Sequence, residues 1–293
     1  MPRGSSREEL RASQAASSDA FVATDPIYKE LHGLLHNEAV SVTKCAKHFV
    51  DHTIAFATDV ERKQELIHFV EVYGGSIVEL AARTPYQDGT IRRRLVGVVH
   101  ELQKATLKDP QSATGEPLHF HDDQESIIWK DLPEFWLACA EERSGFGEQF
   151  RALMVSRPLT LTEPVPWDPT NTTREMERWK NLSAFWAEQS SSSSTDHSKF
   201  ALDAFHEAFE PVEESAQTGD RDFLLQTACI WMINGAKWMW PHCYRGLGGW
   251  NVEKWDHWKR CLEDRQQTSS SDETMALVEE ALAIMSKAED QER

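Results

Sequence analysis

The spacing of the apolar residues constrains this chain more than any other feature of its sequence. After the cap residues Thr58 and Asp59, large apolar side chains recur three and four positions apart, which is the period of one face of an α-helix. These side chains are Leu66, Phe69, Val70, Tyr73, Ile77 and Leu80. Similar stripes follow along most of the chain, and none of it shows convincing strand alternation. The sequence therefore predicts an all-α protein, a multi-helix bundle or helical array of about nine to ten helices.

Low-complexity segments predict how the chain is divided. Residues 1–24 are rich in Ser, Ala and Arg, and we expect them to form a disordered arm. Residues 25–288 are expected to form a single all-helical domain. Two segments interrupt it, a loop at 108–125 that could separate two subdomains and a flexible serine run at 190–195.

Glycines are expected to bend or end two of the helices. The Gly74-Gly75 pair lies inside the stripe around Tyr73, where it would interrupt or kink the helix. The stretch GLGG at 246–249 follows a long apolar run and predicts a helix end and a turn. Because GLGG does not follow a strand, it is not interpreted as a phosphate-binding loop.

Charge and composition exclude several classes of partner. The net charge of −17 disfavours binding to nucleic acid, whose phosphates an acidic surface repels. No apolar run approaches the roughly 20 residues that a bilayer span needs, and the first 20 residues lack the apolar core of a signal peptide. The five cysteines are scattered and include no C-x-x-C pair, so we expect buried or half-buried thiols in a reducing compartment. These features predict a cytoplasmic or nuclear protein that does not bind membranes.

The segment HFHDDQES at 119–126 is the candidate metal site of the sequence. Its His119, His121 and Asp122 combine nitrogen and carboxylate donors suited to zinc or iron. An isoprenoid-synthase-like aspartate box is rejected, because Ser126 stands where a third acidic residue should be. A polar surface loop explains the same residues without a metal, and no cofactor is predicted.

Two histidine pairs have the i, i+4 spacing that places both rings on one helical face. His48 and His52 lie in HFVDH. The acidic residue of this segment is not in the position of the glutamate in the His-Glu-x-x-His motif of metalloproteases. His32 and His36 have the same spacing. For both pairs the sequence favours half-exposed histidines on an amphipathic helix over a metal site.

The stretch CIWMINGAKWMWPHCYRGLGGWNVEKWDHWKRC, residues 229–261, holds six of the eleven tryptophans. The helical spacing of four of them predicts an aromatic core between two helices, made of Trp231, Trp238, Trp255 and Trp258. The other two, Trp240 and Trp250, flank the glycine turn and are predicted to be an exposed pair. Together with His242, Tyr244 and Arg245 they form a candidate binding site.

Several segments of the chain resemble one protein family. The stretch GGWNVEKWDHWKRCLEDR resembles the C-terminal signature of the fungal DUF3632 family, named for a domain of unknown function. Four earlier segments agree in the expected order: IWKDLPEFW at 128–136, ERWKNLSAFWAEQ at 177–189, ALDAFHEAFE at 201–210 and CIWMINGAKWMW at 229–240. The resemblance covers residues 38–266 and implies an all-helical, intracellular fungal protein. It implies no activity, and no catalytic residue is carried over.

Two functions of different classes are consistent with the sequence. No nucleophile motif, phosphate loop or dinucleotide fingerprint is present, which favours a non-enzymatic helical scaffold or protein-interaction protein. Its partner would offer a basic or apolar protein surface to residues 244–250. The alternative is a helical enzyme or small-molecule-binding protein of fungal metabolism. Its aromatic pocket would lie between the helices of residues 231–258, with His242 or the 119–122 segment as polar groups.

Overall fold

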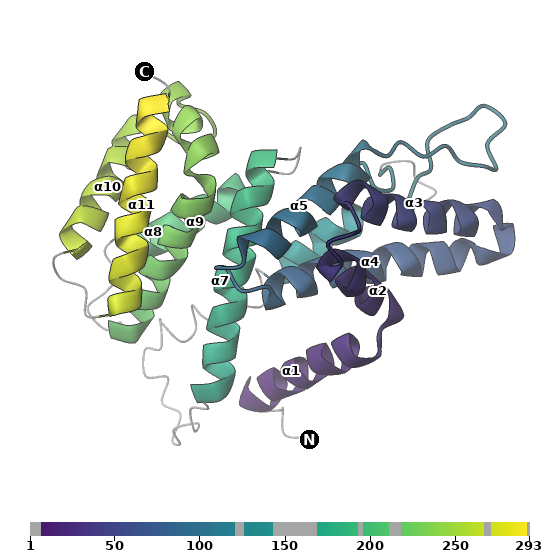
Figure 1. The fold of residues 1–293 in the computed structure, drawn as a ribbon, viewed down its shortest axis with the longest axis horizontal. Helices are drawn as coiled ribbons and strands as arrows, with labels where there is room; N and C mark the ends of the chain where they lie inside the picture. The colour runs from purple at the N-terminus through teal and green to yellow at the C-terminus, as the bar shows by residue number, and fades with distance from the viewer. Residues whose placement is uncertain are drawn as a thin grey trace, which may run out of the picture. The chain divides into compact units, whose positions relative to one another are not determined.

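The structure, a computed structural model of the chain, describes residues 7–120, 126–142, 169–192, 196–210, 218–266 and 271–291. These residues form α-helices joined by turns and loops (Figure 1). Strand-like pairing within them is confined to two isolated bridges, Lys108 with Pro117 and His119 with Ile127. The prediction of an all-α helical array is therefore confirmed. In this part of the chain, each helix is too short or too polar to span a lipid bilayer.

Eleven α-helices occur in the described residues, and a short 3₁₀ turn, η1 (Val60–Arg62), joins the third helix to the fourth. In chain order they are α1 (Arg7–Thr24), α2 (Pro26–His36), α3 (Val42–Thr58), α4 (Lys63–Arg83), α5 (Gly89–Lys104), a helix at 133–142, α7 (Pro169–Ser192), α8 (Ser198–Phe209), α9 (Thr218–Arg245), α10 (Val252–Gln266) and α11 (Asp272–Gln291).

The chain forms two compact units, and the change from one to the other falls within α7. The first unit contains the described residues up to 142 together with α7 as far as Arg178. The second unit contains the described residues from Trp179 onward, including α8 to α11, which are green to yellow in Figure 1. The sequence offered the loop at 108–125 as a subdomain boundary, and its described part, residues 108–120, belongs to the first unit.

Short polar residues explain where several helices of the first unit begin. Asp25 precedes α2 and accepts a hydrogen bond from the backbone N–H of Tyr28, with Pro26 as the first helical residue. Ser41 accepts from the N–H of Lys44 at the start of α3. These caps satisfy N–H groups that lack a partner within the helix, and so they set the helix ends locally.

Aromatic side chains from three segments form the core of the first unit. The ring of Tyr73 on α4 lies 4.3 Å from that of Phe49 on α3 and 5.1 Å from that of Trp129. The indole N–H of Trp129 donates to Thr53 Oγ1 at 3.0 Å. Trp129 has a φ of +66°, a strained conformation for a bulky residue. Its indole is 1% exposed, and that burial offsets the strain.

Of the two effects predicted for the Gly74-Gly75 pair, an interruption of the helix does not occur, because α4 runs without a break from Lys63 to Arg83. A Cβ atom on Gly74 would lie 2.8 Å from the backbone nitrogen of Phe135 and 2.9 Å from the carbonyl carbon of Glu134. Gly74 therefore lets the first turn of the 133–142 helix approach the backbone of α4. A Cβ on Gly75 would meet nothing within 4 Å.

Alanine substitution should separate the roles of these two neighbours. Gly74→Ala should lower the free energy of unfolding by about 1–3 kcal/mol, since the backbone it meets cannot rotate away. Gly75→Ala, the matched control, should raise it by about 0.5–1 kcal/mol, because alanine is the better helix former. Urea unfolding followed by circular dichroism measures both. Equal effects of the two substitutions would contradict the close approach at Gly74.

A buried carboxylate on α4 is the centre of an ionic network in the first unit. Glu79 accepts hydrogen bonds from Arg178 on α7 at 3.0 and 2.9 Å, from Ser18 on α1 at 2.6 Å, and from Arg83 on its own helix. Burial alone would raise the pKa of Glu79. The hydrogen bonds and charge of Arg178, and the hydrogen bonds of Ser18 and Arg83, lower this pKa below its usual value. The carboxylate is therefore ionised at neutral pH.

The same network orders helix α1 (Arg7–Thr24). The composition of residues 1–24 instead predicts a disordered arm. Asp19 on α1 accepts from Arg174 at 2.6 and 2.9 Å and from Arg83 at 2.7 Å. The hydrogen bonds from Arg174 and then Arg83 hold the pKa of Asp19 well below its usual value. These contacts, and an edge-on contact of Phe21 with Tyr28 at 5.9 Å, offset the entropy lost when the helix is ordered.

Replacing the two arginines of α7 should show which ion pair matters for stability. The side chains of Arg178 and Glu79 are 11% and 9% exposed, so Arg178→Met leaves a buried carboxylate with fewer partners. We expect a loss of about 3 kcal/mol in the free energy of unfolding. Arg174→Met removes a more exposed pair with Asp19 and should cost less than about 1 kcal/mol. Denaturant titration of both variants would refute this ranking if Arg174→Met proved the more damaging.

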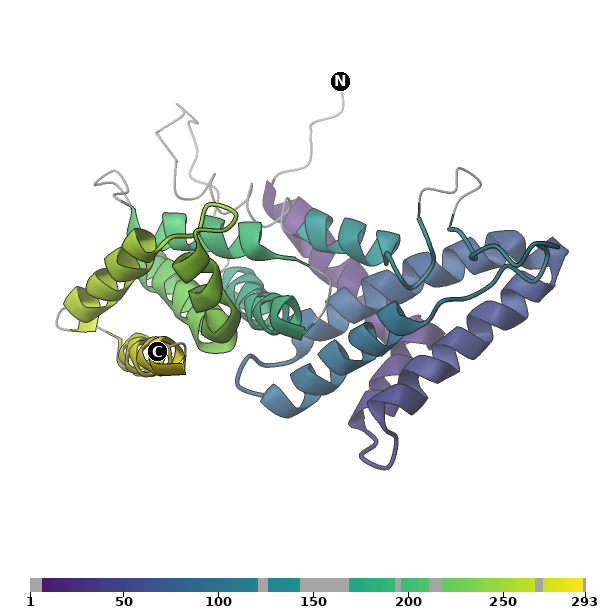
Figure 2. The ribbon, with the colours of Figure 1, turned by 90° about the horizontal axis from the view of Figure 1, so that it is seen from above.

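In the second unit α9 lies against α8, α10 and α11. Figure 2, the view from above, shows α11 nearly end-on. The indole of Trp186 on α7 is fully buried, with ring contacts to Trp179 at 5.5 Å and Phe200 at 5.1 Å. Beside it His197 lies 3.2 Å from Gln189 Oε1, and burial lowers the pKa of His197 to about 3. That histidine is therefore a neutral part of the core.

Candidate functional site

The tryptophans of residues 229–261 lie at the junction of α9 and α10. Of the four predicted for the core, Trp231, Trp255 and Trp258 are buried and Trp238 is half-buried. Trp238 donates its indole N–H to the Ala187 carbonyl at 2.9 Å. Trp255 donates its own N–H to Glu289 Oε1 at 2.9 Å. These bonds satisfy the polar edge of each ring, as burial of an indole requires.

Trp250 was predicted to be exposed, and its side chain is only 1% exposed. Its ring lies 5.3 Å from that of Trp238, 5.7 Å from that of Trp258 and 6.1 Å from that of Phe205. The expectation failed because position along the chain, next to a turn, does not fix the direction of the side chain. Trp250 is thus a core residue of the second unit, and it cannot contact a partner directly.

The glycine turn sends Trp250 inward. Gly246, Gly248 and Gly249 have φ values of +67°, +56° and +86°, in the left-handed region that glycine adopts without a steric penalty. The N–H of Leu247 donates to the His242 carbonyl at 3.0 Å, which closes the C-terminal turn of α9. The chain reverses within these residues and places position 250 against the core.

The remaining candidate binding residues divide between surface and interior. Tyr244 is 65% exposed and Arg245 is also exposed, whereas Trp240 and His242 are half-buried. His242 Nδ1 lies 2.7 Å from the Trp238 carbonyl, so that nitrogen is bonded to its own helix. Two more apolar side chains of the turn are exposed, Leu247 and Val252. We call Tyr244, Arg245, Leu247 and Val252 the α9–α10 rim.

Truncation of Trp250 tests its place in the core. Trp250→Ala should lower the free energy of unfolding by about 3–5 kcal/mol, the usual cost of deleting a buried large aromatic ring. Tyr244→Ala on the same turn removes an exposed ring and should change it by less than about 0.5 kcal/mol. Thermal and urea unfolding report both values. A small effect of Trp250→Ala on the free energy of unfolding would contradict the placement of Trp250 in the core.

Of the predicted metal ligands in the 119–126 segment, the structure describes only His119. His119 is half-buried, and its backbone takes part in the bridge with Ile127. Its Nδ1 is buried and has no hydrogen-bond partner among the described residues. His121 and Asp122 lie outside the residues that the structure describes, so the predicted metal site there stays a prediction.

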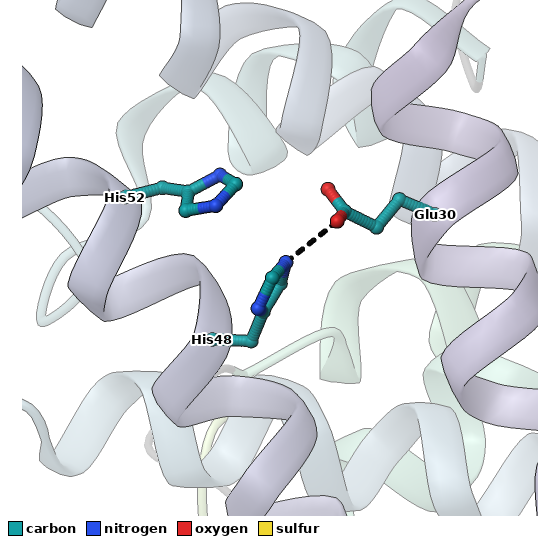
Figure 3. Close-up of side chains that lie close together, drawn as sticks. All are labelled: Glu30, His48 and His52. Atoms are coloured by element: carbon teal, nitrogen blue, oxygen red, sulfur yellow. Dashed lines mark hydrogen bonds and ion pairs between the residues drawn. The ribbon is translucent and has the colours of Figure 1, made fainter.

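A different histidine pair meets a carboxylate in the first unit (Figure 3). His48 and His52 share one face of α3, and Glu30 projects toward them from α2. His48 Nε2 lies 2.7 Å from Glu30 Oε1, and the rings of the two histidines are 4.4 Å apart. All three side chains are half-buried.

The sequence could not reveal this group, although it contained part of the signal. The i, i+4 spacing placed His48 and His52 together, and HFVDH then offered the wrong acidic residue, Asp51, which pairs with Lys47 at 2.6 Å. Glu30 lies 18 residues earlier, on another helix, and only the packing of α2 against α3 brings it near.

The four buried cysteines are not positioned as nucleophiles. All five are free thiols, with Cys261 half-buried and the other four buried. Burial raises the pKa of both Cys45 and Cys243 to about 12, which keeps these thiols protonated at neutral pH. Reactive cysteines show the opposite shift and are accessible. The four buried thiols serve as small apolar groups of the core, whereas Cys261 Sγ lies 3.7 Å from His257 Nε2.

One family model matches most of this chain. It is described as "Protein of unknown function (DUF3632)" and covers residues 75–262, more than half of the 293 residues. The match begins within α4 and ends within α10, so it includes the aromatic core of the second unit and the whole glycine turn, but not Glu30, His48 or His52. No curated protein and no solved structure matches the chain.

Proposed function

Since this chain belongs to the DUF3632 family, whose description names no function, we propose from its geometry that it is a non-enzymatic helical scaffold that binds a protein partner through the α9–α10 rim. The second helical unit carries this surface. No chemical step is assigned to the protein.

One observation carries the proposal. Five large apolar side chains are exposed in the described residues, and three of them, Tyr244, Leu247 and Val252, lie within nine residues of the chain at one turn. They are 65%, 44% and 37% exposed. Exposed apolar side chains that gather at one place, beside polar neighbours, are typical of a protein-binding surface. Tyrosine and arginine, both present in the rim, are enriched among residues that dominate binding energies.

The partner is expected to be a protein that contacts the rim with apolar side chains and carries basic groups around them. The net charge of −17 makes long-range attraction favour a basic partner and repel an acidic one. The core beneath the rim is rigid, because Trp250 is packed on three aromatic rings. A preformed surface loses little entropy on binding.

The alternative, a small-molecule-binding protein or enzyme with an aromatic pocket, has weaker support. The rings of Trp231, Trp250 and Trp255 are almost completely buried against other side chains. A cavity of about 240 Å³ in this unit is lined largely by charged residues of α8, α9 and α10, among them Arg221, Asp222 and Arg265, with Phe209 and two leucines. Pockets for small organic ligands are usually larger, about 300–1,000 Å³, and mostly apolar.

The proposal includes an intracellular location, in the cytoplasm or nucleus of a fungal cell. Five free thiols with no disulfide fit a reducing compartment. The fungal origin rests on the family resemblance alone.

Photo-crosslinking at the rim tests the proposed function. A photoreactive amino acid at position 247 should crosslink a distinct protein in living cells, and Tyr244→Ser in the same chain should reduce that product at least about tenfold. Position 54 is the matched control, because Ile54 is 43% exposed and Leu247 is 44% exposed. The Ser substitution should leave thermal stability unchanged within about 0.5 kcal/mol.

Two results would contradict this function. The first is the same set of products from positions 247 and 54, which would mean that the rim has no specific partner. The second is a product made only of two copies of this chain, which would make the rim a contact between copies.

A further inference from the structure

Two histidines and a glutamate of the first unit form a group that the α9–α10 rim does not use. The potential donor atoms of Glu30, His48 and His52 all lie within 4.8 Å of one another. In the described part of the chain, they are the one group of three such side chains that meets this distance. We propose that this group binds a divalent transition-metal ion of the zinc type, with solvent completing the coordination.

The donor atoms are those that such an ion prefers. Imidazole nitrogen and carboxylate oxygen bind zinc at about 2.0–2.2 Å, and two ligands of a tetrahedral ion are then about 3.4 Å apart. The Glu30–His48 distance of 2.7 Å and the outer limit of 4.8 Å lie on either side of that separation. Small side-chain rotations therefore suffice, and the backbone of both helices can stay in place.

The type of donor also narrows the choice of metal. Two imidazoles suit zinc, cobalt, nickel or iron, whereas magnesium and calcium prefer oxygen ligands alone. Three protein ligands leave at least one coordination position for water. The half-buried state of all three side chains gives solvent access to that position.

The helices place these ligands firmly. His48 and His52 are one turn apart on α3, and the next residue after each, Phe49 and Thr53, is fully buried. The ligands thus lie at the border of the core. The His48 ring contacts that of Phe49 at 5.2 Å, and the His52 ring contacts that of Phe69 at 6.0 Å. Apolar rings beside a metal site lower the local dielectric and strengthen its electrostatic attraction.

An ion pair between Glu30 and His48 does not account for the whole arrangement. Such a pair needs one imidazole, yet the His52 ring lies beside the same carboxylate in Figure 3. Two protonated rings 4.4 Å apart would repel each other. A divalent cation lets both rings act as neutral donors while the carboxylate balances part of its charge.

A metal titration of the full chain tests the site. Protein stripped with EDTA is titrated with ZnCl₂ by calorimetry and with CoCl₂ while the visible spectrum is recorded. We expect one ion per chain, visible Co²⁺ absorption from a site of low coordination number, and a rise in Tm with zinc. Both Glu30→Gln and His52→Gln should weaken zinc binding at least about 100-fold and remove the Co²⁺ bands. Glu30→Gln retains an acceptor for His48, and His52→Gln is the second variant if the first lowers stability.

The controls test the two other histidine sites that the sequence offered. His36→Gln alters the pair on α2 that has the same spacing as His48 and His52, with rings 4.0 Å apart, and should leave binding unchanged. His119→Gln, in the 119–126 segment, should do the same. Binding that survives His52→Gln, binding lost in His119→Gln, or no binding near one equivalent would each overturn the proposal. None of these outcomes depends on the rim, so this site and the proposed function fail separately.

Discussion

Both units of this protein depend on the burial of large aromatic rings between helices. An indole or phenol ring removes about 150–250 Å² from water when it is buried. Tyr73 and Trp129 in the first unit, and Trp186 and Trp250 in the second, are almost completely buried. The helices therefore pack where these rings fit, and the strained backbone of Trp129 shows that ring burial overrides a local preference.

Charged groups are buried only where they have partners. Glu79 in the first unit is held by Arg178, Arg83 and Ser18, and in the second unit Lys180 Nζ lies 3.2 Å from Glu273 Oε1. An uncompensated charge at either place would cost several kcal/mol. The Arg178–Glu79 and Lys180–Glu273 pairs link helices that are distant in sequence, and the hydrogen bond of Ser18 with Glu79 is one of the contacts that order α1.

The two candidate sites are physically independent. The rim consists of three exposed apolar side chains and Arg245 over a buried aromatic core, which suits a protein surface. The Glu30–His48–His52 group offers polar donors at the border of another core, which suits an ion. The family match covers the rim and leaves out the donor group, so the metal site is proposed for this chain and not for the family.

The sequence by itself determined the helical class, the end of α9 at the glycine turn and the family of the chain, because apolar spacing, glycine conformation and short motifs act locally. It also drew attention to Tyr244 and Arg245 of the rim and to the His48–His52 pair, but not to Glu30. Only the tertiary structure decided which way Trp250 faces, why Gly74 must be glycine, and which carboxylate meets His48. Each of these depends on a segment distant in sequence, and no local pattern encodes where that segment packs.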